Sequence, residues 1–485
     1  MSTTAAAGTS APAGRLHIRG LGLLEREAGL VALLALYVVV VLAALPQTLV
    51  QDSWLTLVGG REIAQHGLPS TDTLTVWSHG KPWIDQQWLA QVAFYGLDRL
   101  GGIKLVLLMH ALLLGSAFAA ALAVARRRAS QKCVVLVGAV CMFLAPWALQ
   151  MRAQSFAPLL FVALLGLLVA DSRAPGGRVL LVVPLLALWT NLHGTAVLGA
   201  ALVVLHALTR FRAAPCRRLE SLALLASPAV LVASPYGLSL VGYYHRMLTS
   251  PLLGKFLDEW RPSTPSSRTA LFYVLAFAAT WLVARHARAL SRFELLALAS
   301  LTVSALLAIR SIVWFALACT ILLPPLLDRE LAPRPSASRL LPRGRMAPLV
   351  APLAIFVAVS VVATRPSSWF EGGFPADAVP AIQHELRDPA VRVLADDRHA
   401  DWLLWQLPQL RGRVAYDIRF ELFSPSQFRE LIAYRSRAGR DWQAAGRGYA
   451  LVVVDPREVP AATLRQYGRP LYRNDDVVVL RNRTA

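Results

Sequence analysis

The sequence predicts an α-helical polytopic membrane protein with about 11 transmembrane helices and a small C-terminal extracytoplasmic α/β domain. Of its 485 residues, 56% are hydrophobic and 16% are charged, whereas a soluble globular chain carries about 25% charged residues. The apolar residues gather in runs, and a helix needs about 20 such residues to cross a bilayer. Residues 364–485 differ, because they contain only short apolar runs. This composition excludes a disordered chain, a collagen and an ordinary cytosolic enzyme.

The net charge of +20 does not indicate a nucleic-acid partner, because the basic residues lie in short gaps between apolar runs. Membrane proteins use basic residues in this way, so we expect a lipid bilayer as the partner and no nucleic acid. Arg supplies 45 of the 49 basic residues, and this richness in Arg, with that in Ala, suggests a bacterial genome rich in G and C. The four cysteines form no disulfide framework and show no metal-ligand spacing.

Eleven apolar runs are candidate spans. The first, 29–50, is too long for the apolar region of a secretory signal and precedes no small-residue cleavage site, so we expect it to remain as a span. Several runs are short, and 179–209 can be divided in more than one way, so the count holds to within one or two. The other runs are 103–125, 133–149, 156–170, 179–191, 196–209, 219–235, 270–284, 293–309, 312–327 and 346–363.

Basic residues set the orientation. If the N-terminal tail, 1–28, is cytoplasmic, the inside loops hold 21 of the 31 Lys and Arg that precede residue 364, as the positive-inside rule requires. An odd number of spans over 29–363 then places 364–485 outside a bacterial plasma membrane. Two long outer segments, 51–101 and 236–269, contain acids, aromatics and Pro. We therefore expect any site to lie on the outer face.

The C-terminal residues alternate between two patterns. A helix-like stretch covers 426–435, and it lies between short runs rich in β-branched and aromatic residues. With 18 basic and 15 acidic residues, 364–485 is close to neutral. About 120 residues suffice for a core of their own, so we predict a small α/β domain. The strand-like runs are 391–395, 414–416, 450–454 and 477–480.

Asp52 lies where the chain leaves the first span. A partly desolvated carboxylate at such a place can have its pKa raised towards that of a useful general base, or it can accept a cation. The alternative is a solvated interfacial acid that ends the helix. Downstream, the apolar residues of 85–100 follow a helical period, so this stretch predicts an amphipathic helix on the membrane surface. Trp83 and its neighbouring tryptophans also fit an aromatic belt.

Several short motifs follow one another from about residue 30 to the C-terminus. Their order and spacing resemble those of bacterial integral-membrane glycosyltransferases of the GT-C architecture, which take a sugar from a polyprenyl-phosphate carrier. The motifs are Asp52-x-Trp54 followed by Gly60 and Ile63, Gly67-x-Pro69-x-x-Asp72, Pro82-Trp83 followed by Trp88-Leu89, Arg152-x-Gln154, Trp189-x-Asn191-x-His193-Gly194, Ser234-Pro235-x-Gly237, Glu259-Trp260-x-Pro262 and Asp417-x-Arg419.

The resemblance implies a GT-C-like transmembrane domain that transfers a hexosyl or pentosyl group to an envelope glycan, lipid or protein. It implies that Asp52 contacts the acceptor and serves as catalytic base or metal-site residue. No cofactor is certain, and a divalent cation is left open. A donor phosphate at the outer interface needs cations, and the candidates are Arg152, Arg310 and Lys255. The candidates for acceptor or sugar binding are His193, Asp72, Asp85, Glu259 and Trp83.

Two positions depart from the family's pattern. Thr56 stands where relatives often have His, and Gln87 stands where they often have Glu. Arg310 lies between two closely spaced spans, where a charge is costly and indicates function, although its side chain could also reach the lipid phosphates. His193 could serve in proton transfer or could simply end a turn.

Two other functions remain open. A transporter of lipid-linked sugars predicts ionisable residues in mid-span and broken helices; His110 and His206 are the main residues of that kind. A non-catalytic envelope scaffold, with 364–485 binding another protein, is consistent with the departures at Thr56 and Gln87. The transferase requires Asp52, Arg152, His193 and Arg310 to lie around one outward cavity, and a scatter of more than about 15 Å would contradict it.

Overall fold

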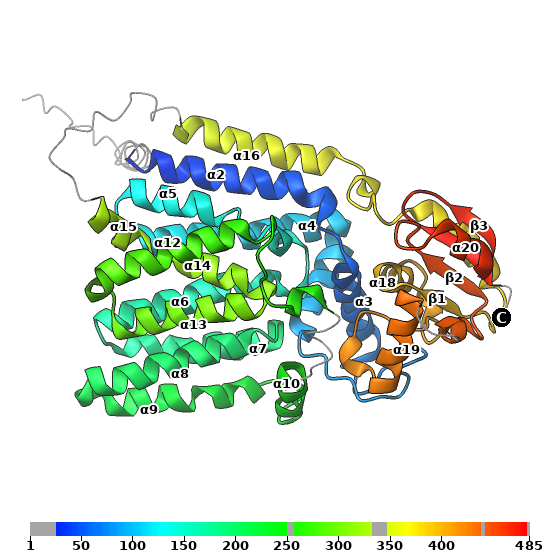
Figure 1. Ribbon diagram of the computed structural model, residues 1–485, viewed down its shortest axis with the longest axis horizontal. Coiled ribbons are helices and arrows are strands. Elements are labelled where there is room, and N and C mark those ends of the chain that lie inside the picture. Colours follow the sequence, from blue (N-terminus) through cyan, green and yellow to red (C-terminus); the bar gives the residue numbers. More distant parts are fainter. Residues whose placement is uncertain (1–25, 250–256, 332–346, 438–441, 483–485) are drawn as a thin grey trace, which may run out of the picture.

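The computed structural model describes residues 26–249, 257–331, 347–437 and 442–482. It consists of a bundle of roughly parallel helices and a C-terminal unit that contains the β-strands and lies at one end of the bundle (Figure 1). Helices α2 and α16 lie side by side along one edge of the bundle, and α16 leads into the C-terminal unit (Figure 1). The predicted tail 1–28 lies almost wholly outside the described residues.

Each of the eleven predicted apolar runs contains a helix. The helices before residue 365 are α2 (Ala28–Ala44), α3 (Gln51–His66), α4 (Trp88–Arg126), α5 (Gln131–Cys141), α6 (Ala157–Arg173), α7 (Val182–Leu192), α8 (Ala196–Ala213), α9 (Arg218–Ala226), α10 (Ser239–Thr249), α12 (Ala270–His286), α13 (Arg292–Leu307), α14 (Ile312–Leu322), α15 (Pro324–Glu330) and α16 (Ala347–Thr364).

In the described chain, four helical segments are long and apolar enough to cross a membrane, and a fifth is added if α14 and α15, bent by 50°, form one broken span. Four further apolar helices have only 10–17 residues. A helical membrane-associated chain is therefore supported, while the number of about 11 spans stays a prediction. The four long segments are Ala28–Gln47, Trp88–Arg126, Ala153–Arg173 and Ala270–Ala289.

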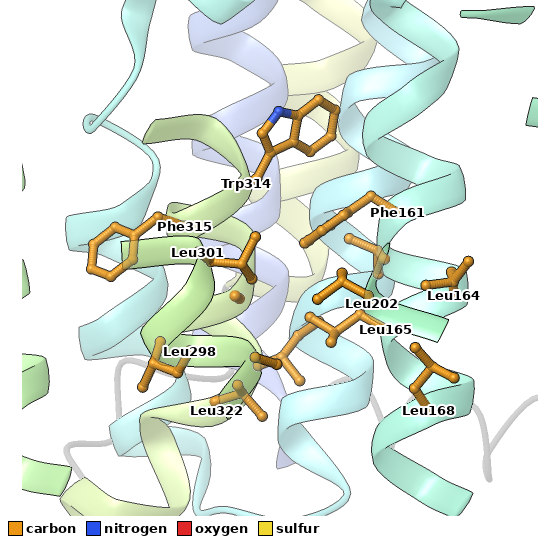
Figure 2. Packing of buried hydrophobic residues seen from close by; sticks show 14 of the residues in the cluster. Phe161, Leu164, Leu165, Leu168, Leu202, Leu298, Leu301, Trp314, Phe315 and Leu322 are labelled. Atoms are coloured by element: carbon orange, nitrogen blue, oxygen red, sulfur yellow. The ribbon is translucent and has the colours of Figure 1, made fainter. Parts of the chain in front are cut away.

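Large apolar side chains fill the centre of the bundle. Burial of this kind stabilises by roughly 25 cal/mol per Å² of apolar surface where the alternative is water, and by close packing where the alternative is lipid. Figure 2 shows the meeting point of four helices. The labelled residues are Phe161, Leu164, Leu165 and Leu168 of α6, Leu202 of α8, Leu298 and Leu301 of α13, and Trp314, Phe315 and Leu322 of α14.

Ion pairs hold together the helix ends that carry the basic loops. The buried Glu294 carboxylate, in the first turn of α13, binds Arg128 at 2.7 Å and Arg173 at 2.6 Å. Nearby, Asp171 binds Arg210 at 2.7 Å. These contacts join the ends of helices α4, α6, α8 and α13 that are predicted to be cytoplasmic. The C-terminal unit lies at the opposite end of the bundle (Figure 1).

The predicted outer segment 51–101 is largely helical. Its first part is helix α3, and its last part, 88–100, is the beginning of α4, which continues beyond a kink at Gly101 and Gly102. The expected helix over 85–100 is present, but its buried side chains are Ala90, Gln91 and Phe94, and it packs on α3. Part of its surface therefore faces protein.

The C-terminal unit contains a four-stranded sheet of β1 (Val393–Ala395), β2 (Leu451–Val454), β3 (Gly468–Arg473) and β4 (Val478–Asn482), in the order β1-β2-β4-β3. Strands β1 and β2 are parallel and the other pairs are antiparallel. Its helices are α17 (Val379–Glu385), α18 (Asp397–Gln406), α19 (Pro425–Ser436) and α20 (Ala461–Tyr467).

Helix α19 and three of the four predicted strands are confirmed. The run 414–416 is not a regular strand and forms only isolated bridges, and β3 was not predicted. Val414 bridges Val393 on one side and Thr75 on the other, and the amides of Val76 and Trp77 donate to its carbonyl and that of Ala415. A segment of the first outer region therefore extends the sheet beyond β1.

The C-terminal unit shares a buried core with the bundle. One cluster contains Val41 of α2, Trp54 of α3 and Val106 of α4 together with Val393 and Trp402 of the C-terminal unit. A second cluster belongs to the C-terminal unit itself, around Tyr416 and Phe428. The boundary at residue 364 thus marks a change of composition, while the apolar packing continues across it.

Gly60→Ala tests the close packing of α3 on α4. A Cβ at Gly60 would lie 2.3 Å from the Gln91 carbonyl oxygen and 2.5 Å from the Cβ of Tyr95. The helices must separate to admit it, and overpacking of this kind costs about 1–3 kcal/mol. We expect a lower thermal unfolding midpoint for the detergent-solubilised protein. Gly96→Ala on α4 is the matched control, because nothing lies within 4 Å of a Cβ there. Equal midpoints for the two variants would contradict the packing.

Candidate functional site

Backbone contacts place Asp52 beside Arg152. The Met151 amide donates to the Thr48 carbonyl at 2.9 Å, and the Ser53 hydroxyl donates to the Met151 carbonyl at 2.6 Å. The start of α3 is thereby fixed to the turn before α6. Across this junction, Arg152 Nε lies 3.2 Å from Asp52 Oδ2.

Arg152 also binds Glu259, which comes from a third segment. Arg152 Nη1 donates to Glu259 Oε2 at 2.8 Å, and Arg310 Nη1 lies 3.8 Å from Glu259 Oε1. The Ile309 amide donates to the Arg261 carbonyl at 3.0 Å, and this contact holds the two loops together. The Arg310 guanidinium lies 4.4 Å from the ring centroid of Trp260. Asp52, Arg152, Glu259 and Arg310, hereafter the outer cluster, therefore form one chain of alternating charges.

His193 follows α7 and lies within electrostatic reach of Arg152, Glu259 and Arg310. Burial and the Arg310 charge lower the pKa of His193 to about 3, so its ring is neutral near pH 7. Nδ1 accepts the Thr195 amide at 3.2 Å. A neutral ring with Nδ1 as acceptor carries its proton on Nε2, so His193 can offer a hydrogen bond and cannot serve as a cation.

The two acids of the outer cluster have different proton affinities. Burial raises the pKa of Asp52, and the Arg152 charge opposes this effect only in part. Burial also acts upward on Glu259, but Arg310 and Arg152 together hold the pKa of Glu259 below its usual value. The two side chains are 31% and 32% exposed, and their pKa values are shifted in opposite directions. Two carboxyls whose pKa values differ in this way can divide the tasks of base and charge partner.

Arg152, Glu259 and Arg310 of the outer cluster line a small cleft, whereas Asp52 does not line it and is paired with Arg152. The cleft has a volume of about 40 Å³, and its polar lining residues include Gln150, Arg152, Gln154, Glu259 and Arg310. An apolar groove of about 60 Å³ shares four lining residues with it, Leu114, Ala148, Pro158 and Val313. The groove is otherwise lined by Tyr37, Ala117, Phe118, Cys141, Met142, Ala145, Leu149, Ala316, Leu317 and Thr320.

Asp72 and Trp83 lie in a second, buried cluster. Arg419, 2% exposed, binds Asp72 Oδ1 at 2.7 Å and Asp417 Oδ2 at 2.8 Å. Its guanidinium lies 4.2 Å from the ring centroid of Trp83. This clip, formed by Asp72, Trp83, Asp417 and Arg419, fastens the loop after α3 to the C-terminal unit. The burial of Asp72 and Trp83 indicates a structural task for both, where the sequence had suggested contact with a sugar.

Asp85 lies near the clip and is 3% exposed. Its Oδ1 accepts the Gln91 side-chain amide at 3.0 Å, and its Oδ2 has no hydrogen-bond partner among the described residues. Burial raises the pKa of Asp85 to about 7, against the opposing charge of Arg419. Glu421, which the sequence analysis did not single out, is half-buried beside it, and burial raises its pKa to about 7 as well.

The remaining candidates from the sequence contribute no side chain to the outer cluster among the described residues. Lys255 is outside the described residues. Thr56 is buried and donates to the Asp52 carbonyl at 2.7 Å, so its hydroxyl is used within α3. Gln87 precedes the first residue of α4 and is half-buried. His110 bonds Ser155 and the Leu149 carbonyl at 2.8 and 2.9 Å, so this mid-span residue is satisfied within the protein.

Neither a protein-family model nor a curated protein sequence matches the chain. The geometry of the site therefore carries the functional argument.

The described residues do not fit a divalent cation. No group of three or more His, Cys, Asp or Glu among them is arranged to hold a metal ion. Asp52 and Glu259 both face Arg152, whose guanidinium takes the position between the two carboxylates. We therefore derive no step through a metal.

Two acids of the C-terminal unit were missed by the sequence analysis. Asp401 of α18 is fully buried, its Oδ1 has no hydrogen-bond partner among the described residues, and it lies within electrostatic reach of Asp52 and Asp417. Glu421 follows the predicted Asp417-x-Arg419 motif by two residues. The sequence marks Glu421 only by its place next to this motif. Its neighbours from the loop before α4 are more than 300 positions away, and such distant contacts leave no local sequence pattern.

Asp85→Asn tests the electrostatics of the Asp85 and Glu421 pair. The pKa of Asp85 is about 7 in the folded protein against an ordinary 3.8. The folded state therefore holds the proton more strongly, and stability falls as the pH rises between these two values. About three pKa units at about 1.4 kcal/mol each set an upper limit of about 4 kcal/mol. We expect the wild-type unfolding midpoint to fall from about pH 5 to about pH 8.

In Asp85→Asn the unfolding midpoint should fall less between about pH 5 and about pH 8. Ionisation of Glu421 accounts for part of the remaining fall. Asp377→Asn, at an exposed acid of the C-terminal unit, should follow the wild-type curve. The same pH dependence in Asp85→Asn and wild type would contradict the assignment.

Proposed function

We propose that the chain is an integral-membrane glycosyltransferase of the GT-C type. It moves a sugar from a polyprenyl-phosphate donor to an envelope acceptor on the outer face of a bacterial plasma membrane. The proposal includes about 11 spans, with 364–485 extracytoplasmic. The basic helix ends that meet at Glu294 and the position of the C-terminal unit at the opposite end of the bundle support this orientation.

The observation that carries the proposal is the meeting of Arg152, Glu259 and Arg310 where a polar cleft adjoins an apolar groove, with Asp52 paired to Arg152 beside them. These residues come from segments up to 258 positions apart. A polyprenyl phosphate has one charged group and one apolar chain, and it needs cations beside an apolar path. The groove supplies the path and the two arginines supply the cations.

Asp52 is the general base in this scheme. It takes the proton from an acceptor hydroxyl while the acceptor oxygen bonds to the anomeric carbon of the sugar. The bond between that carbon and the phosphate oxygen breaks with its electron pair, and the polyprenyl phosphate leaves. Arg310 and Arg152 stabilise the negative charge that collects on the leaving phosphate. The raised pKa of Asp52 makes its carboxylate a stronger base than that of an ordinary aspartate.

Glu259 keeps the arginines in place between turnovers. Its carboxylate contacts both guanidinium groups, so the cations are compensated when no phosphate is bound. An incoming phosphate competes with Glu259 for Arg310, which is held at the longer distance of 3.8 Å. Replacement of Glu259 by the phosphate as the partner of Arg310 would explain why a phosphate site contains a carboxylate, although a carboxylate repels phosphate.

A non-catalytic scaffold is the second candidate. The outer cluster carries two arginines and two acids, so its charges balance without a ligand, as in a purely structural ion network. The two functions differ in one outcome, since only a transferase loses turnover when Asp52 is made neutral with the fold retained. Transport is not favoured, because His110 is hydrogen-bonded internally and His206 is bound to Asp171 at 2.8 Å.

Asp52→Asn tests the proposal. Membranes that contain the full chain are supplied with radiolabelled polyprenyl-phosphate sugars, and transfer into the envelope fraction is measured. Loss of a general base costs about 10²- to 10⁴-fold in rate, so we expect that decrease in Asp52→Asn. The variant should elute from detergent gel filtration as wild type does, because Asn keeps the shape of the side chain.

Asp377→Asn is the matched control and should retain wild-type transfer. Transfer in Asp52→Asn within about twofold of wild type would remove Asp52 from the chemistry, since a base contributes at least about 10²-fold. Failure of the wild type to transfer from every donor supplied would favour the scaffold.

A further inference from the structure

The outer loop 258–269 reaches the cleft near both of its ends. Near its start, Glu259 accepts a hydrogen bond from Arg152 Nη1 at 2.8 Å. Near its end, the Arg268 guanidinium lies 4.7 Å from the ring centroid of Trp147. Trp147 lines the same cleft as Arg152 and Glu259. The loop therefore brings an acid into the cleft and a cation to its rim.

Hydrogen bonds fix the backbone of this loop. The hydroxyl of the buried Ser263 donates to the Ala305 carbonyl, in the last turn of α13, at 2.5 Å. The hydroxyl of the buried Thr269 donates to the Thr264 carbonyl at 2.6 Å and closes the turn before α12. The Arg268 side chain is exposed, but its backbone is held in this turn and its stacking on an aromatic ring is favourable. The guanidinium is therefore kept at the rim.

Arg268 has no acid partner in the described chain, unlike the other arginines around the cleft. In the outer cluster, two acids offset two arginines. Arg261, of the same loop, lies 3.0 Å from Asp258. Within the described part of the chain, no carboxylate lies within ion-pair distance of Arg268. Because the charges of the outer cluster cancel, Arg268 adds a positive charge that no described acid compensates.

The indole of Trp147 has a second feature that suits an anion. Its ring is half-buried, and its Nε1 is a buried donor without an acceptor among the described residues. A buried N–H without an acceptor is destabilising, so native proteins rarely retain one without a cause. An oxyanion beside the ring would accept this hydrogen bond and would also compensate the Arg268 charge.

We propose that Arg268 and Trp147 form the rim of an anion site and make the cleft select a phosphate group over an uncharged headgroup. Since the charges of the outer cluster already cancel, an entering phosphate would leave one negative charge in excess. Arg268 compensates that charge, and Trp147 Nε1 donates to a phosphate oxygen. The assignment of the phosphate to a polyprenyl donor rests on the proposed function, whereas the selection of an anion rests on the rim.

Binding of small probes to the full chain tests this selectivity. The protein is purified in a maltoside detergent, which contains no phosphate. Farnesyl phosphate carries charge and an apolar chain, farnesol carries the chain alone, and inorganic phosphate carries the charge alone. At low ionic strength we expect Arg268→Gln to bind farnesyl phosphate about tenfold more weakly than wild type and farnesol equally well. Added salt should reduce the difference, because the charge of an exposed side chain is screened.

Two variants separate the Arg268 charge from its stacking. Arg268→Lys keeps the charge and loses the planar group, so it should bind farnesyl phosphate more tightly than Arg268→Gln does. Arg365→Gln is the matched control, because Arg365 is exposed and lies 5.4 Å from the ring centroid of Trp369, away from the residues that line the cleft. It should bind both prenyl probes as wild type does.

Several results would overturn the rim site. These are binding of farnesyl phosphate by Arg268→Gln within about twofold of wild type, an equal loss of farnesol binding, and equal losses in Arg268→Lys and Arg268→Gln. Weaker binding in Arg310→Gln with none in Arg268→Gln would keep the proposed donor site and remove the rim cation. No binding of farnesyl phosphate by wild type would contradict both proposals.

Inorganic phosphate identifies the source of the phosphate. Its displacement of farnesyl phosphate at equal concentration would point to a free phosphate, and its failure to displace would point to a lipid phosphate; either result supports the anion site. Because the readout is binding, a protein that passes this test without any sugar transfer would keep the anion site and lose the proposed function.

Discussion

The candidate site of this protein depends on one guanidinium group. Arg152 lies between the carboxylates of Asp52 and Glu259, at 3.2 and 2.8 Å, and these acids are 207 positions apart in the chain. Without that cation the two carboxylates would repel each other in a partly buried place, where an uncompensated charge costs several kcal/mol. The same ion pairs hold the loop of Glu259 over the cleft and so define the mouth of the apolar groove.

The second constraint is the attachment of the C-terminal unit. Pairing of the residues around Thr75 with those around Val414 extends the sheet, and the buried Arg419 fastens the same two segments through Asp72. A shared apolar core then seats the unit on α2, α3 and α4. The unit is therefore part of the wall of the site, which explains how Glu421, more than 350 residues after Asp52 in the chain, reaches the same end of the bundle.

The sequence predicts well whatever follows from local composition. Every predicted apolar run contains a helix, because hydropathy acts residue by residue, and Asp52 and Arg152 were found because they end apolar runs. Helix α3 was missed since its buried face includes Gly59, Gly60 and Thr56, which carry little hydropathy. Strand β3 was missed because Arg469, Pro470 and Arg473 interrupt its pattern. The contact of Arg419 with Asp72 joins residues 347 positions apart and leaves no local sequence pattern. Asp72 was therefore predicted to bind an acceptor or a sugar, and its ion pair with Arg419 was not foreseen.

The central claim is that the outer cluster and the apolar groove form one site for a lipid phosphate. Photo-crosslinking of the purified chain with a polyprenyl phosphate that carries a diazirine in its chain tests this most directly. We predict labelled peptides from α2, α4 and α14, which carry Tyr37, Phe118 and Leu317 of the groove, and much weaker labelling in Arg310→Ala. Labelling spread evenly over the lipid-facing helices, or unchanged in Arg310→Ala, would contradict the account.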